Sequence, residues 1–216
     1  MLTDSAVFAK SRERTLTNEM HKLQPLYGGA IVCPIPEGFL DASILREVPD
    51  TQEVFVNSRD VSEQGKFEDG LGLDESIIVD LLERVEASND RAALEMHLEE
   101  ITGLNGSNDW TVARLAIGDG VVAHQTCIAV ETAYKWGKED HSETLVLCVA
   151  LLRLEDVQTD VVLSVNLPIN KTDSLKDLHD WIKDPTTDAP RQVESAYNVL
   201  TTMASNFKVL DSSLFV

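Results

Sequence analysis

The sequence is poor in cysteine and has no paired cysteine motif. Its three cysteines, Cys33, Cys127 and Cys148, are widely spaced and odd in number, without the CxxC pairs of zinc and redox sites. Each lies in an apolar, strand-like stretch, where a free thiol packs as a small hydrophobic group. The pattern argues against a disulfide framework, and we expect a reduced, intracellular environment.

Basic residues are also scarce. Lysine and arginine total 18 against 37 aspartates and glutamates, so the formal net charge is −19. Because affinity for nucleic acid comes largely from cationic contacts to phosphates, a nucleic-acid partner is not expected. An acidic surface can attract basic partners over long range, or it can serve solubility alone. Composition leaves both readings open.

Long apolar runs are missing as well. The first residues, MLTDSAVFAKSRERTLTNEMHK, contain no apolar core of the kind found in signal peptides, and no window approaches the length of a membrane span. We therefore expect no membrane association. A monomer is also expected. Residues 1–22 are predicted to be a flexible extension, and residues 23–216 a single domain, because no Gly/Ser or Pro linker divides them.

Signatures of catalysis and of metal or cofactor binding are absent from the sequence. The five histidines show no HExxH or other paired spacing, and neither a GxSxG elbow nor a P-loop is present. Gly70-Leu71-Gly72 lacks the third glycine of a dinucleotide fingerprint. The prediction is a protein without catalytic residues, cofactor or metal, although an enzyme whose residues converge only in space stays an alternative.

The hydrophobic pattern predicts an α/β (α+β) fold in which helices flank an antiparallel sheet. Short turns join successive long apolar segments, which is typical of hairpins because parallel strands need long crossovers. The segment LVLCVALLRL is apolar at both alternations, which indicates a central strand covered on both faces. The expected strands are 30–33 (ended by Pro34 and Pro36), 53–57, 110–117, 121–136, 144–154 and 160–167, and the expected helices are 74–86, 92–101 and 191–207.

The predicted helix at residues 74–86 carries an acidic pair. On a helical wheel its apolar residues form one stripe, whereas Asp80 and Glu83 fall one turn apart on the outer face with Val79 beside them. An exposed apolar residue flanked by like charges suits a docking surface. The alternative is an ordinary solvated helix face, and the residues alone do not decide between the two.

Several blocks together resemble the Mog family, the guanine-nucleotide release factors of the small GTPase Ran. The resemblance covers residues 26–215, whereas residues 170–189 match no motif. It rests on Tyr27-Gly28-Gly29-Ala30, Asp41-Ala42-Ser43 with Leu45-Arg46, Val48-Pro49-Asp50-Thr51-Gln52-Glu53-Val54-Phe55, Ile77-Ile78-Val79-Asp80-Leu81-Leu82-Glu83, and Ala150-Leu151-Leu152-Arg153-Leu154 followed by Gln158-Thr159-Asp160.

The resemblance implies an α/β/α sandwich on an antiparallel sheet, a fold shared with the photosystem protein PsbP. It also implies that the protein binds Ran, promotes release of its nucleotide, and acts in nuclear transport, in the nucleus and also in the cytoplasm. It implies further that acidic residues on the first helix are part of the Ran-binding surface, and Asp80 and Glu83, with Val79 beside them, match that position. Asp50 and Glu53 are further candidates, although Asp50 could simply end a turn and Glu53 could pair within the fold. A scaffold protein with the same fold is the alternative function.

Overall fold

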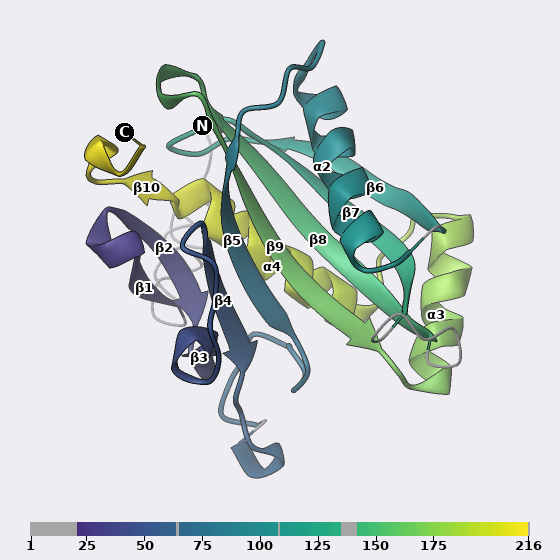
Figure 1. The fold of residues 1–216 in the computed structure, drawn as a ribbon. Coiled ribbons are helices and arrows are strands. Elements are labelled where there is room, and N and C mark those ends of the chain that lie inside the picture. Colours follow the sequence, from purple (N-terminus) through teal and green to yellow (C-terminus); the bar gives the residue numbers. More distant parts are fainter. Residues whose placement is uncertain (1–20, 64, 108, 135–141, 216) are drawn as a thin grey trace, which may run out of the picture.

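The main sheet has seven antiparallel strands in the order β3-β4-β5-β9-β8-β7-β6. The computed structural model describes residues 21–63, 65–107, 109–134 and 142–215 (Figure 1). The strands of this sheet are β3 (Phe39–Asp41), β4 (Gln52–Asn57), β5 (Ser76–Glu83), β6 (Trp110–Gly118), β7 (His124–Tyr134), β8 (Ser142–Leu154) and β9 (Thr159–Ile169). A smaller sheet, ordered β1-β2-β10, contains β1 (His21–Leu26), β2 (Ile31–Pro36) and β10 (Lys208–Val209).

The predicted hairpins are confirmed. Strands β6 to β9 follow one another in the chain, and each pairs antiparallel with the next. β8 lies between β7 and β9, and its residues from Val146 to Leu152 are all at most 1% exposed. Both of its faces are therefore covered, as its continuous apolar sequence predicts.

Helices cover both faces of the main sheet. The helix α2 (Asp90–Leu104) packs on one face, here called the α2 face, and its first turn is capped by Asn89, whose side chain accepts the N–H of Ala92. The helix α4 (Arg191–Asn206), the smaller sheet and the helix α3 (Thr172–Lys183) pack on the other, here called the α4 face. Figure 1 shows this order of layers, and the expected α/β/α sandwich is confirmed. None of the helices in the described ranges is long and apolar enough to cross a bilayer.

The predicted helix at residues 74–86 is wrong, because this segment forms the strand β5. Its apolar residues fit a helical stripe, but they fit equally well a strand that is partly buried on both faces. β5 lies between β4 and β9, and the β-branched run Ile77-Ile78-Val79 suits an extended backbone. The pairing of β5 with β9 over eight residues decides the conformation.

The change from helix to strand separates the predicted acidic pair. Successive side chains of a strand point to opposite faces, so Asp80 lies on the α2 face and Glu83 on the α4 face. Val79, predicted to be exposed beside them, is 0% exposed and belongs to the core between the sheet and α4. The shared outer surface of Val79, Asp80 and Glu83 is therefore wrong.

Two boundaries near the start of the chain also differ from expectation. Pro34 and Pro36 do not end the first strand but lie within β2. β10 pairs with Ile31 and Val32, and the rest of this edge of β2 has no strand partner among the described residues, so a missing N–H is tolerated there. The expected extension at residues 1–22 lies outside the described residues except for its last two, which begin β1.

Shortening Val79 is predicted to destabilise the fold. The Val79→Ala variant removes two buried methyl groups and leaves a cavity, which should lower the free energy of unfolding by about 2 kcal/mol in urea denaturation. The matched Val61→Ala variant changes a side chain that is 73% exposed and should lose less than about 0.5 kcal/mol. Equal stabilities of the two variants would contradict the burial of Val79.

Candidate partner-binding surface

The strands β4 and β5 bring two of the predicted acidic residues to one end of the sheet. Gln52 pairs with Asp80, and the N–H of Leu81 bonds the carbonyl of Thr51 at 2.9 Å. Asp50, just before β4, and Glu83, at the end of β5, therefore lie at the same end of the two strands. Both are exposed.

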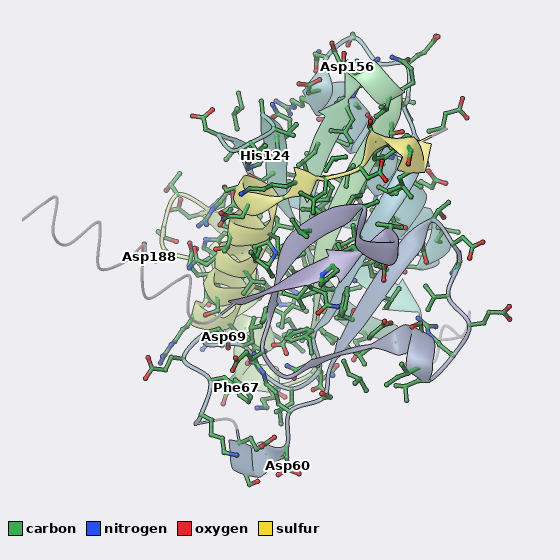
Figure 2. The ribbon with its side chains drawn as sticks, turned by 90° about the vertical axis from the view of Figure 1, so that its left-hand side faces the viewer. Asp60, Phe67, Asp69, His124, Asp156 and Asp188 are labelled. Atoms are coloured by element: carbon green, nitrogen blue, oxygen red, sulfur yellow. The ribbon has the colours of Figure 1, made fainter. Side chains whose placement is uncertain are left out.

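This end of the sheet is also where β8 turns into β9. Glu83 pairs with Thr159, and the N–H of Arg84 bonds the carbonyl of Gln158 at 3.1 Å. Figure 2 shows Asp156, in the same turn, at one end of the molecule and Asp60, in the connection from β4 to β5, at the other. Asp50 and Glu83 thus belong to the Asp156 end.

Asp80 occupies an unfavourable position on the α2 face. Burial raises the pKa of its carboxyl group, and the nearby carboxylate of Glu100 raises the pKa further, whereas the Gln52 side chain, by hydrogen bonding, and His97 oppose the rise. Its Oδ1 atom is buried and has no hydrogen-bond partner among the described residues. A buried, unpartnered acceptor costs roughly 1–3 kcal/mol.

Glu53 is tied to the first motif block. Its Oε1 accepts the backbone N–H of Tyr27 at 2.6 Å, and the Tyr27 hydroxyl lies 2.7 Å from the carbonyl oxygen of Val79 and 3.0 Å from that of Thr51. Burial raises the pKa of Tyr27 far above its ordinary value, so its hydroxyl stays a neutral donor. The expectation that Glu53 pairs within the fold holds for Oε1, whereas Oε2 has no partner among the described residues.

Tyr27 itself was not identified as a site residue from the sequence. Its φ of 50° and that of Gly28, 66°, form a left-handed turn that glycine accommodates and tyrosine adopts only when other contacts hold it. The contacts to β4 and β5 supply that support. The signal in the sequence was the paired glycine after an aromatic residue, but its partner, 26 residues away, is set by tertiary structure.

The segment between β3 and β4 presents an exposed apolar pair that the sequence analysis also missed as a site. Asp41 accepts the N–H of Ser43 at 2.8 Å and starts a short 3₁₀ helix, η2 (Ala42–Ile44), whose Ala42 is buried. Ile44, the last residue of η2, and Leu45, the residue after it, are 66% and 67% exposed. Apolar side chains in this setting contribute nothing to the core, and they lie on the segment that leads to Asp50.

The last motif block forms a buried polar network that holds neighbouring strands and the helix α2 in place. Asp160 is 0% exposed and bonds the Nε of Arg153 and the Nε2 of His97, each at 3.0 Å. It also accepts the N–H of Val85 at 3.1 Å, and Arg153 donates to the carbonyl of Val85. These bonds join β8, β9, α2 and the segment after β5. Arg153 and Asp160 therefore position the surface without being part of it.

The acidic end of the sheet carries the exposed carboxylates of Asp50 and Glu83. Four cavities of about 310 to 570 Å³ are lined by other described residues and include none of Asp50, Glu53, Asp80 and Glu83. In the same part of the chain, no three His, Cys, Asp or Glu side chains are placed to hold a metal ion. What the arrangement offers is a set of carboxylates beside exposed apolar side chains, which suits contact with a protein.

Comparison with known proteins gives consistent matches over most of the chain. The family model for the Ran-interacting Mog1 protein matches residues 24–168. The nuclear import protein MOG1 of Saccharomyces cerevisiae is 45% identical over 193 residues, covering 88% of this chain and 83% of the yeast protein. The Ran guanine nucleotide release factor of Homo sapiens is 32% identical over 151 residues, covering 67% and 74%.

A solved structure agrees in fold as well as in sequence. The 1.9 Å crystal structure of the Saccharomyces cerevisiae Ran-binding protein Mog1p matches with a TM-score of 0.75 and 43% identity, covering 91% of this chain and 98% of the yeast chain. Residues 24–168, which the family model matches, contain the motif blocks and the surface described above. This chain belongs to the Mog1 family.

Proposed function

We propose that the protein binds the GTPase Ran and promotes release of its guanine nucleotide, as a factor in nucleocytoplasmic transport. The names of its relatives, a nuclear import protein and a Ran guanine nucleotide release factor, support this role. The observation that carries it is the exposed acidic and apolar surface formed by the blocks around Asp50 and Glu83. The protein is proposed to act in the nucleus and also in the cytoplasm.

The proposed Ran surface consists of Ile44, Leu45, Asp50, Glu53 and Glu83, with Asp80 on the adjoining α2 face. Exposed apolar side chains flanked by charges are the usual make-up of a protein interface. The net charge of −19 would speed encounter with a basic region of the GTPase. Val79 contributes only as core support, since it is fully buried.

The position of Asp80 supports a functional role for this residue. A carboxyl group with a buried, unpartnered oxygen lowers stability, and such groups in native proteins call for an explanation. A basic group of the partner, approaching at the edge of the α2 face, would supply the missing interaction. The cost in the free protein would then be recovered in the complex.

Release of nucleotide requires that the protein bind the nucleotide-poor state of Ran more tightly than the loaded state. Carboxylates can achieve this by pairing with basic groups that otherwise hold the phosphates of the nucleotide. Asp50 and Glu83 are exposed and placed together at the end of the sheet, which suits them to this competition. A scaffold with the same fold would instead bind both states of Ran equally.

Charge reversal at the proposed surface should abolish most of the activity. Asp50→Lys and Glu83→Lys are each expected to slow the stimulated release of a fluorescent guanine nucleotide from Ran at least about tenfold, because charge pairs across interfaces couple by roughly 1.5–7 kcal/mol. The matched control is Asp188→Lys, an exposed carboxylate that lies beside α4 in Figure 2, and it should release at the wild-type rate. Wild-type rates in both surface variants would overturn the assignment.

The salt dependence of association should distinguish long-range electrostatic attraction to Ran from direct contact with it. Raising the ionic strength from about 0.05 to 0.5 M shortens the screening length below 10 Å, so the association rate of the wild type with Ran should fall several-fold. The Asp50→Lys and Glu83→Lys double variant should show a much shallower dependence in the same stopped-flow measurement. A salt dependence as steep as that of the wild type would place the steering charges elsewhere on the protein.

Asp80→Asn should stabilise the free protein and weaken its action on Ran. Because the pKa of Asp80 is raised in the folded state, that state binds the proton more tightly than the unfolded chain does. Wild-type stability therefore falls as the pH rises from about 3.9, the ordinary value, through the raised pKa. Asparagine does not titrate, so urea denaturation should show the variant more stable at pH 7, with a gain that disappears below about pH 4.

The same variant tests the trade-off between stability and activity. If Asp80 contacts Ran, Asp80→Asn should release nucleotide more slowly than the wild type even though it is more stable. Full activity together with higher stability would show that Asp80 lies outside the interface. A loss of stability at pH 7 would contradict the unfavourable burial of its carboxyl group.

A further inference from the structure

The strand β6 forms one edge of the main sheet and is paired on one side only. It follows β7 as the last strand in the sheet order, and its outer edge meets no other strand of the described residues (Figure 1). A β-bulge lies between Val112 and Arg114, and residues 114–118 then pair with β7 without interruption. The outer edge of this regular part offers unpaired N–H and C=O groups, which can pair with an added strand.

Apolar side chains line this edge on the α2 face. Val112, Leu115 and Ile117 are 36%, 37% and 76% exposed. Leu115 pairs with Cys127 and Val112 with Ala129, and both partners belong to the core under α2, so the three side chains lie on that face. Beside them is a cavity of about 510 Å³ between the edge strand and the start of α2, lined by Asn89, Asp90, Arg91, Leu115, Ala116, Ile117 and Gln125.

The charge within the strand is directed away from this face. Arg114 forms an ion pair with Glu194 of α4 at 2.8 Å and lies over the rings of Trp181 and Tyr197. All three contacts are on the α4 face. Residues 110–118 therefore present apolar side chains without a charge on the α2 face, and a charge there is a common protection of edge strands.

Carboxylates stand at both ends of the strand. Asp109 precedes β6 and Asp119 follows it, and both are exposed. Neither carboxylate forms a hydrogen bond or ion pair with the described residues. An apolar edge with an unpaired negative charge at each end is complementary to an extended segment with apolar residues in its middle and basic residues at its ends.

We propose that the β6 edge is a second protein-binding surface, which takes up an extended segment of a partner polypeptide as an eighth strand. The segment pairs with residues 114–118, places alternate apolar side chains on Leu115 and Ile117, and brings basic residues to Asp109 and Asp119. A second copy of this chain fits poorly, because antiparallel pairing of two β6 strands would bring Asp109 of one copy to Asp119 of the other. Two chains of net charge −19 also repel each other.

The test uses a displayed library of random twelve-residue peptides, selected on the full-length protein. The enriched peptides should share alternating apolar residues and basic ends, and a labelled copy should bind with an affinity that falls as salt rises. The double variant Leu115→Lys, Ile117→Lys should weaken binding at least tenfold. The control Leu104→Lys, at a side chain that is 82% exposed on α2, should stay within twofold of the wild type.

Two further measurements distinguish strand addition from other contacts. Peptide binding should slow amide hydrogen exchange in residues 114–118, and the double variant Asp109→Asn, Asp119→Asn should bind more weakly with a shallower salt dependence. Nucleotide release from Ran by the Leu115→Lys, Ile117→Lys variant should be unchanged, so that this proposal and the proposed Ran surface can fail separately.

Five outcomes would overturn the proposal. The first is a selection that yields no peptide dependent on Leu115 and Ile117, and the second is exchange protection outside β6. The third is a wild-type dimer that these substitutions dissociate, which would make a second copy the occupant. The fourth is faster exchange in β6 after deletion of residues 1–20, which would make the chain's own first segment the occupant. Loss of Ran activity in the lysine double variant would assign β6 to the Ran surface instead.

Discussion

The strands β8 and β9 are buried on both faces, and this burial determines how the other layers are arranged. Their middle parts bury apolar side chains in both alternations, from Val146 to Leu152 in β8 and from Val161 to Leu163 in β9, so the two strands require a layer on each side of the sheet. α2 covers one face, and α4 with the smaller sheet covers the other. The exposed residues of both proposed binding surfaces lie on the outer strands, at strand ends and in the connecting segments.

Polar contacts determine the positions of the elements that carry those surfaces. The network of Asp160, Arg153 and His97 holds α2 and the segment after β5 against the two central strands. Tyr27 performs a similar role for the start of β4, because it connects Glu53 with the carbonyls of Val79 and Thr51. Some motif residues thus hold the strands and helices in place, whereas others, Leu45, Asp50 and Glu83 among them, are exposed. Asp80 belongs to neither group: it is partly buried in the sheet, but its unpartnered oxygen lowers stability.

The local sequence pattern predicted much of the fold. It predicted the candidate site only in part. The hairpins from β6 to β9, α2 and α4 were predictable because long periodic segments and short turns leave few alternatives. The segment containing Asp80 was not, since Ile77, Ile78 and Val79 fit a helical stripe and a two-sided strand alike. That error also placed Val79 at the surface and paired Asp80 with Glu83, because a side chain's direction depends on the period of its backbone.

The family, the layered class of the fold and the acidic character of the surface were predictable before folding, because they depend on motif identity, composition and periodicity. Three features could be seen only in the folded chain: residues 76–83 are a strand, Tyr27 bonds Glu53, and β6 has no partner on its outer edge among the described residues. Each of these depends on pairing between residues far apart in the chain. The free energy of such pairing exceeds the small local preferences that a sequence pattern can report.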